Sequence, residues 1–153
     1  MTLLIPGIAG LMGVLVMTLL LRRARYLWLP ETQMIRAIGS VLTKDAEHAL
    51  MPGFVVHTTV GVVFAYIYYL FLSTAPALPE GGKGIAVMMV VCGVMGLVHG
   101  LIVTLFLVIS VAQYHPVAEF RKLEPGDMAS HVLGHLGYGL TVGFCLSWLP
   151  MVM

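Results

Sequence analysis

Four long runs of apolar residues, each without a Lys, Arg, Asp or Glu side chain, constrain this chain most strongly. They cover residues 3–21, 53–72, 85–111 and 129–152. A helix needs about 20 apolar residues to cross the hydrocarbon core of a bilayer, and every run is close to that length or longer. Only 10% of the 153 residues are charged, against about 25% in soluble domains. The sequence therefore predicts a single all-α, polytopic membrane domain with four transmembrane helices in a lipid bilayer, and it excludes a soluble globular domain.

The cations are distributed unequally between the two ends of the predicted spans. The connecting segments 22–52 and 113–128 hold seven of the eight Lys and Arg side chains, and the eighth is Lys83. Loops rich in Lys and Arg remain in the cytoplasm, so both charged loops are predicted to be cytoplasmic and both termini extracytoplasmic. Arg22 and Arg23 follow the first apolar run. A cleavable signal peptide carries its cations before the run, so we expect this segment to remain as an anchor.

The first charged loop contains a short amphipathic pattern. Its apolar side chains recur at helical spacing, with Arg36 on the opposite face: Met34, Ile35, Ile38, Val41 and Leu42. This pattern is typical of a helix that lies on the membrane surface. Because the pattern covers only three turns, a solvated connector is the alternative.

The first span aligns with the third, and the second span aligns with the fourth. The matched positions are Gly7, Gly10 and Thr18 with Gly93, Gly96 and Thr104, and His57 and Gly61 with His135 and Gly139. We predict a duplicated helical hairpin. The two tandem αα-hairpins would cross the membrane in the same direction, as a parallel internal repeat with a pseudo-two-fold axis along the membrane normal.

Short motifs along the chain are similar to those of one known family. They lie at residues 10–18 (G-x-x-x-x-x-x-M-T), 38–42 (I-G-S-V-L), 57–68 (H-x-x-x-G-x-x-F-A-x-x-Y) and 134–139 (G-H-L-x-Y-G). In these motifs the chain resembles a family of uncharacterised four-helix bacterial inner-membrane proteins, classed as a domain of unknown function. The resemblance implies a fold and a bacterial inner-membrane location, and it supplies no activity. It carries over to His57, Gly61, Tyr68, His135, Tyr138 and Gly139. Segment 113–128 is more charged than the family pattern implies.

Six histidines are the chemically richest feature of so apolar a chain. His57 and His135 lie near the cytoplasmic ends of their spans, and the repeat makes them equivalent. If its axis passes between the second and fourth spans, the two imidazoles face each other at one depth. Gly61 and Gly139 lie one turn deeper on the same faces and would leave space beside the rings. Two opposed imidazoles can hold a transition-metal ion or both axial positions of a haem.

Further candidate metal ligands lie close to these spans. His131 and His135 both lie in the fourth span, four residues apart. At this spacing two imidazoles on one helix can hold one ion. His115 and Glu119 share that spacing after the third span, although Pro116 can break the helix that would align them, and Asp127 precedes the fourth span. Interfacial histidines are commonly solvated, which is the alternative for His115. The predicted ligand set is His57, His131 and His135, with His115, Glu119 and Asp127 as weaker members.

His99 lies near the middle of the third span, about 18 Å from the predicted cytoplasmic end at the rise of an α-helix. This depth predicts that His99 does not join the other histidines. A second, deeper site or a proton-relay position is one interpretation. An interhelical hydrogen bond is the other.

Three functional hypotheses follow. The first is a non-enzymatic membrane protein that binds a transition metal or haem, in metal handling, electron transfer or the support of a respiratory complex. The second is a structural or accessory subunit, or a homo-oligomeric scaffold, whose histidines form interhelical hydrogen bonds. The third is a small transporter or channel.

Several other classes of function are not expected. A net charge of +1 argues against a nucleic-acid partner. Cys92 and Cys145 form no Cys-x-x-Cys motif, which argues against a thiol oxidoreductase. The sequence contains no recognisable nucleophile motif and no phosphate-binding glycine loop. An enzymatic activity is therefore not expected.

Overall fold

A computed structural model describes residues 3–74 and 81–152 of the chain. The regular secondary structure of these residues is helical, and it includes four long helices: α1 (Leu4–Arg22), α3 (Leu50–Ser73), α4 (Gly81–Phe106) and α5 (Pro125–Val152). A shorter helix, α2 (Met34–Thr43), lies between α1 and α3 in the sequence. The four long helices are long and apolar enough to cross a membrane. The prediction of an all-helical protein with four such segments is confirmed.

The outer faces of the long helices are apolar. Leu11 on α1, Phe71 on α3, and Val90 and Ile102 on α4 are each more than half exposed. Water would penalise such continuous apolar faces, whereas lipid tails are as apolar as the side chains themselves. These faces indicate a lipid bilayer environment.

Helix α5 begins four residues before the predicted span. Pro125 occupies its first turn, where the missing proline N–H costs no hydrogen bond. The Asp127 carboxylate accepts a hydrogen bond from the backbone N–H of Glu124 at 3.0 Å and lies near the positive end of the helix dipole. The predicted boundary was set by the last charged residue, but charged residues at a helix start are favourable. The helix therefore extends beyond the apolar run.

The end of the third span is less regular than predicted. After Phe106 the chain forms a π-helical turn, Leu107–Val111, followed by 3-10 turns at Ala112–Tyr114 and Ala118–Arg121. His115 and Glu119 therefore do not lie on one face of a continuous α-helix, and the break occurs just before Pro116. This is the outcome that the proline favoured.

The predicted amphipathic segment is helical, and it packs against α3. Gly39 of α2 lies so close to the backbone of Ala49 that an added Cβ atom would overlap the Ala49 carbonyl. Gly53 of α3 is in the same relation to the carbonyl of Ile35. Two glycines thus let the backbones of α2 and α3 touch, and α2 is docked rather than a solvated connector.

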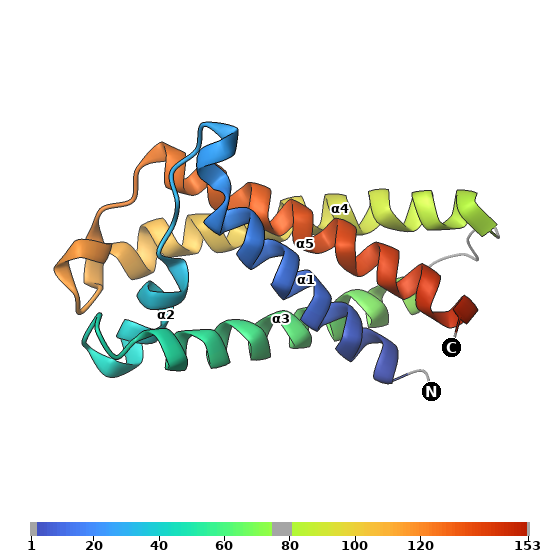
Figure 1. Ribbon diagram of the computed structural model, residues 1–153, viewed down its shortest axis with the longest axis horizontal. Helices are drawn as coiled ribbons and strands as arrows, with labels where there is room; N and C mark the ends of the chain where they lie inside the picture. The colour runs from blue at the N-terminus through green and yellow to red at the C-terminus, as the bar shows by residue number, and fades with distance from the viewer. Residues whose placement is uncertain (1–2, 75–80, 153) are drawn as a thin grey trace.

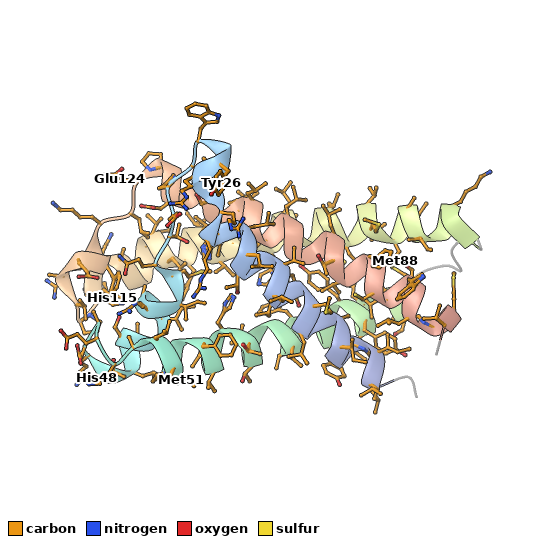
Figure 2. The ribbon with its side chains drawn as sticks, viewed as in Figure 1. Tyr26, His48, Met51, Met88, His115 and Glu124 are labelled. Atoms are coloured by element: carbon orange, nitrogen blue, oxygen red, sulfur yellow. The ribbon has the colours of Figure 1, made fainter. Side chains whose placement is uncertain are left out.

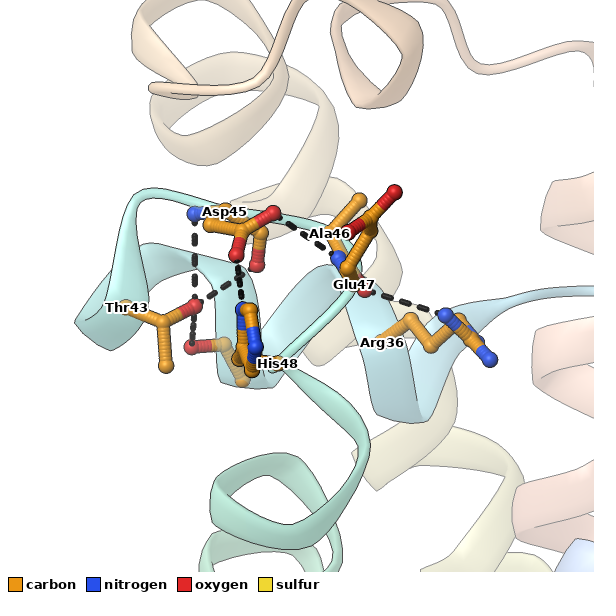
Figure 3. A network of polar contacts seen from close by, with 7 residues as sticks. Arg36, Thr43, Asp45, Ala46, Glu47 and His48 are labelled. Carbon is orange, nitrogen blue, oxygen red and sulfur yellow. Dashed lines mark hydrogen bonds and ion pairs between the residues drawn. The ribbon is translucent and has the colours of Figure 1, made fainter.

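Polar contacts fix the turn that joins α2 to α3 (Figure 3). Arg36 donates a hydrogen bond to the carbonyl of Ala46 at 3.0 Å. The Asp45 carboxylate contacts the ring of His48 and accepts the backbone N–H of Glu47 at 2.9 Å. These contacts, that of His48 first, hold the pKa of Asp45 below its usual value. The turn is therefore set by its own side chains at the exposed end of the bundle.

The five helices pack in the order α2, α3, α1, α5 and α4 around an incomplete ring. Figure 1 shows α1 crossing α3 and α5. Helix α1 packs against both α3 and α5, α5 packs along α4, and α2 packs on α3. Within the described residues the backbones of α3 and α4 scarcely approach each other, so the ring is open between them. The start of α1 and the end of α5 lie at one end of the molecule, and α2 lies at the other.

The aligned glycines Gly10 and Gly96 both lie at helix crossings. A Cβ atom on Gly10 would lie 2.7 Å from the Val62 Cα, where α1 crosses α3. A Cβ atom on Gly96, the aligned residue, would lie 3.0 Å from the Gly139 Cα, where α4 crosses α5. However, α1 packs closely on α5, whereas the backbones of the matching pair, α4 and α3, scarcely approach each other. The internal repeat remains a prediction, and the halves do not meet symmetrically.

Candidate functional site

A cavity of about 210 Å³ lies in the open side of the helix ring. Every α-helix contributes to its lining, and the side chains are apolar apart from four histidines and one tyrosine: His57, His99, His131, His135 and Tyr138. The cavity joins side chains that are far apart in the sequence. It is the place in the described structure where titratable groups gather inside the bundle.

Two of these histidines belong to one face of α5. The ring centroids of His131 and His135 are 4.8 Å apart. The Nδ1 atom of His135 lies 2.9 Å from the carbonyl oxygen of His131. Because a carbonyl only accepts, Nδ1 of His135 carries the proton and Nε2 presents a lone pair. Histidines that bind metals are commonly oriented by such a bond to a backbone carbonyl.

His57 of α3 and His131 of α5 each bury a nitrogen without satisfying it. The two side chains are 9% and 7% exposed, and their Nε2 atoms have no hydrogen-bond partner among the described residues. A buried polar atom without a partner costs about 1–3 kcal/mol. Two side chains that line one cavity and carry such nitrogens are suited to a ligand that accepts both lone pairs.

His99 of α4 lies in the same cluster. Its ring stacks on Phe64 of α3 with centroids 3.8 Å apart and meets the ring of His135 edge-on at 4.8 Å. Its Nδ1 is 3.4 Å from the hydroxyl of Tyr68. The expectation that His99 lies too deep to join the other histidines is wrong.

The reason for this error is the start of α5. His135 is ten residues from the first residue of α5, which places it about 15 Å along the helix, deeper than its predicted span implied. Helices α4 and α5 then cross closely, since a Cβ atom on Gly100 would lie 2.7 Å from the Cβ of His135. That crossing brings His99 to the level of His135.

The two glycines expected to leave space beside the imidazoles serve helix packing instead. A Cβ atom on Gly61 would overlap the side chain of Val14, and one on Gly139 would overlap the carbonyl of Cys92. Gly61 still borders the cavity, and its carbonyl accepts a 2.5 Å hydrogen bond from Tyr138. The expected open space at Gly139 is therefore absent.

The weaker predicted ligands lie outside the cavity. His115 accepts the Val117 N–H at Nδ1, at 3.1 Å, and donates from Nε2 to the Ala37 carbonyl at 3.0 Å, so both ring nitrogens are in use. Figure 2 shows His115 beside α2, at the same end as His48. Glu119 is exposed, and Asp127 caps the start of α5. The structure does not bring these three residues to His57.

Sequence reasoning missed two sulfur side chains that line the cavity, Met17 of α1 and Met34 of α2. Both are buried, at 3% and 9% exposure. Neither lies in a motif, because a Met in an apolar run looks like any other core residue. Their position beside the histidines becomes apparent only in the tertiary structure, where α1 and α2 line the same cavity as the helices that carry the histidines.

Comparisons with protein-family models, with curated proteins and with solved structures gave no match to this chain. The resemblance to a bacterial four-helix membrane family therefore remains a prediction. As placed, no three His, Cys, Asp or Glu side chains among residues 3–74 and 81–152 converge closely enough to hold a metal ion. The four imidazoles line the cavity without meeting at one point.

Proposed function

We propose that the protein is a non-enzymatic integral membrane protein that binds a transition-metal ion in the histidine cavity. One observation carries the proposal: the side chains of His57 and His131 line one cavity, and their buried Nε2 atoms have no partner in the described residues. Nε2 of His135 adds a third lone pair. An ion bound by all three side chains would satisfy these nitrogens.

The chemistry of the lining supports an ion of the later transition metals. Neutral imidazole suits zinc, copper, iron and nickel, whereas magnesium and calcium prefer oxygen ligands. The bond from His135 to the His131 carbonyl supplies the outer support that a metal-binding histidine needs. His99 borders the same cavity and is available as a fourth ligand or as a support for His135.

The size of the cavity favours an ion over a haem. Pockets for drug-sized ligands measure about 300–1,000 Å³, and haem is larger than most such ligands. The histidine cavity measures about 210 Å³. An ion with its imidazole ligands and a water molecule fits that space.

The proposed setting is the bacterial inner membrane, with α2 on the cytoplasmic surface of the membrane, the charged loops in the cytoplasm and both termini outside. The unequal distribution of cations supports this orientation. The site then opens towards the cytoplasmic half of the bundle. A role in metal handling, electron transfer or the support of a respiratory complex is compatible with that position.

Metal analysis of the purified protein tests the proposal. We expect about one tightly bound ion per chain, a rise in thermal stability when the ion is added to stripped protein, and loss of both effects in His57→Gln and His131→Gln. His48→Gln is the matched control, since His48 is exposed and does not line the cavity. The proposal is rejected if the parent protein holds no stoichiometric metal. A Soret band in its absorption spectrum would show that the bound group is haem and not an ion.

The second candidate is a structural role for the same histidines, in an accessory subunit or a homo-oligomer. The stacking of His99 on Phe64 and its contact with Tyr68 favour this candidate, because such contacts join α3 to α4 without any ligand. In that case the His99→Phe variant, which keeps the stacking on Phe64, is as stable as the parent protein. Added metal then stabilises neither the parent protein nor the variant. A stabilisation by metal that His57→Gln abolishes decides against it.

A further inference from the structure

The histidine cavity also contains two thioether side chains that none of the preceding arguments uses. Met17 of α1 and Met34 of α2 both line it, and both are almost fully buried. They come from helices other than those that carry the histidines. The cavity therefore offers a mixed set of imidazole nitrogens and thioether sulfurs.

The same lining carries no negative charge. No Asp, Glu or Cys side chain of the described residues borders the cavity. Cys92 is buried at the crossing of α4 and α5, where its backbone carbonyl packs against Gly139. Every candidate ligand at the site is thus a neutral group.

A neutral ligand set in a membrane selects against highly charged ions. The cost of moving an ion out of water into a low-dielectric interior is large and rises with the square of its charge. The charge of a divalent ion would not be neutralised by these ligands. Moving a monovalent ion out of water costs about a quarter of the free energy that a divalent ion requires. Among transition metals, the ion that is both monovalent and drawn to thioether sulfur is Cu(I).

Methionine is suited to complete such a site. Its side chain is unbranched and polarisable, so it adapts to the position of an ion without movement of the backbone. Met34 lies on α2, which packs against α3. Met17 lies on α1. Sulfur ligands would therefore come from two helices that carry none of the cavity histidines.

We propose that the ion is copper in the Cu(I) state, held by the cavity histidines together with the thioethers of Met17 and Met34. This inference rests on the proposed function and names the ion that the same site selects.

Competition titrations of the full-length protein in detergent test it. Cu(I) is kept reduced with ascorbate and offered against a coloured Cu(I) chelator, and Zn(II) is titrated separately. We expect Cu(I) to bind more tightly than Zn(II). Met17→Leu and Met34→Leu should each weaken Cu(I) binding at least about tenfold, the loss that even an outer-shell partner causes. Their Zn(II) affinity should stay at the parent value.

Met95→Leu is the matched control, since Met95 is a partly buried core residue that does not line the cavity. X-ray absorption of the Cu(I)-loaded parent protein gives a second readout, in which sulfur should appear among the nearest neighbours of copper. The copper assignment is overturned if no sulfur is found there. It is also overturned if a variant that combines Met17→Leu and Met34→Leu binds Cu(I) as tightly as the parent protein. If Zn(II) binds through the histidines while Cu(I) does not, only the copper assignment falls. If neither ion binds the parent protein, the proposed function falls with it.

Discussion

The histidines of this chain differ in what their ring nitrogens do. Both nitrogens of His115 bond to the backbone, and its side chain is 2% exposed. Nε2 of His57 has no partner in the described part of the chain. A buried, fully bonded imidazole holds structure together, whereas a buried nitrogen without a partner carries a cost that a ligand can remove.

We therefore expect His115→Ala to lower stability without affecting metal binding. The change removes two hydrogen bonds, each worth about 0.5–1.5 kcal/mol. One accepts the Val117 N–H within the segment after α4, and the other ties that segment to the Ala37 carbonyl of α2. Thermal unfolding in detergent should show a loss of roughly 1–3 kcal/mol, and metal stoichiometry should stay at the parent value. Equal stability with lost metal would mean that His115 is a ligand after all.

At the scale of elements, the contact of α2 with α3 depends on two glycines, which have no side chain at the point of contact. Gly39 and Gly53 let the two backbones touch, and either added methyl group would overlap a carbonyl oxygen of the other helix. Helices in membranes associate through such small residues, since no hydrophobic effect drives them together in lipid. Helix α2 carries Met34 to the cavity, so this contact also shapes the site.

Gly53→Ala and Gly39→Ala should each push α2 away from α3. Overpacking of this kind costs about 1–3 kcal/mol, and we expect a lower unfolding temperature and weaker metal binding together. Gly82→Ala is the control, because nothing lies within 4 Å of a Cβ atom there. If Gly53→Ala behaves as Gly82→Ala does, the close approach of the two helices is incorrect.

The sequence predicts the existence of the helices more accurately than the positions of their ends. The four spans and α2 follow from runs and periodicities within single segments, and their existence was predicted. The ends were less accurate: α5 starts at Pro125, because capping and the helix dipole favour a start among polar residues. That shift of four residues was sufficient to misplace the depth of His135 relative to His99.

At the scale of the whole molecule, the arrangement of the charged loops predicts an orientation. Lys83 lies at the start of α4 and Lys122 lies in the segment before α5, and both are exposed. If the segments rich in cations are cytoplasmic, these two residues lie on opposite sides of the membrane. The same orientation places the histidine cavity nearer to the cytoplasm.

Cysteine labelling in intact cells checks the orientation. Lys83→Cys should react with a membrane-impermeant maleimide added outside, and Lys122→Cys should react only after the membrane is permeabilised. The two native cysteines are buried and serve as the background. The reverse pattern would place the termini in the cytoplasm.

The sequence by itself determined the number of apolar helices long enough to span a membrane and the short helix between the first two. These properties are local, because a segment in lipid must be apolar and must satisfy its own backbone hydrogen bonds. The tertiary structure alone decided that the backbones of α3 and α4 stay apart, that His99 joins His57, His131 and His135, and that two methionines line the same cavity. Neighbouring helices in a membrane are selected by small-residue contacts and crossing positions rather than by hydropathy, and no single segment of sequence contains that information.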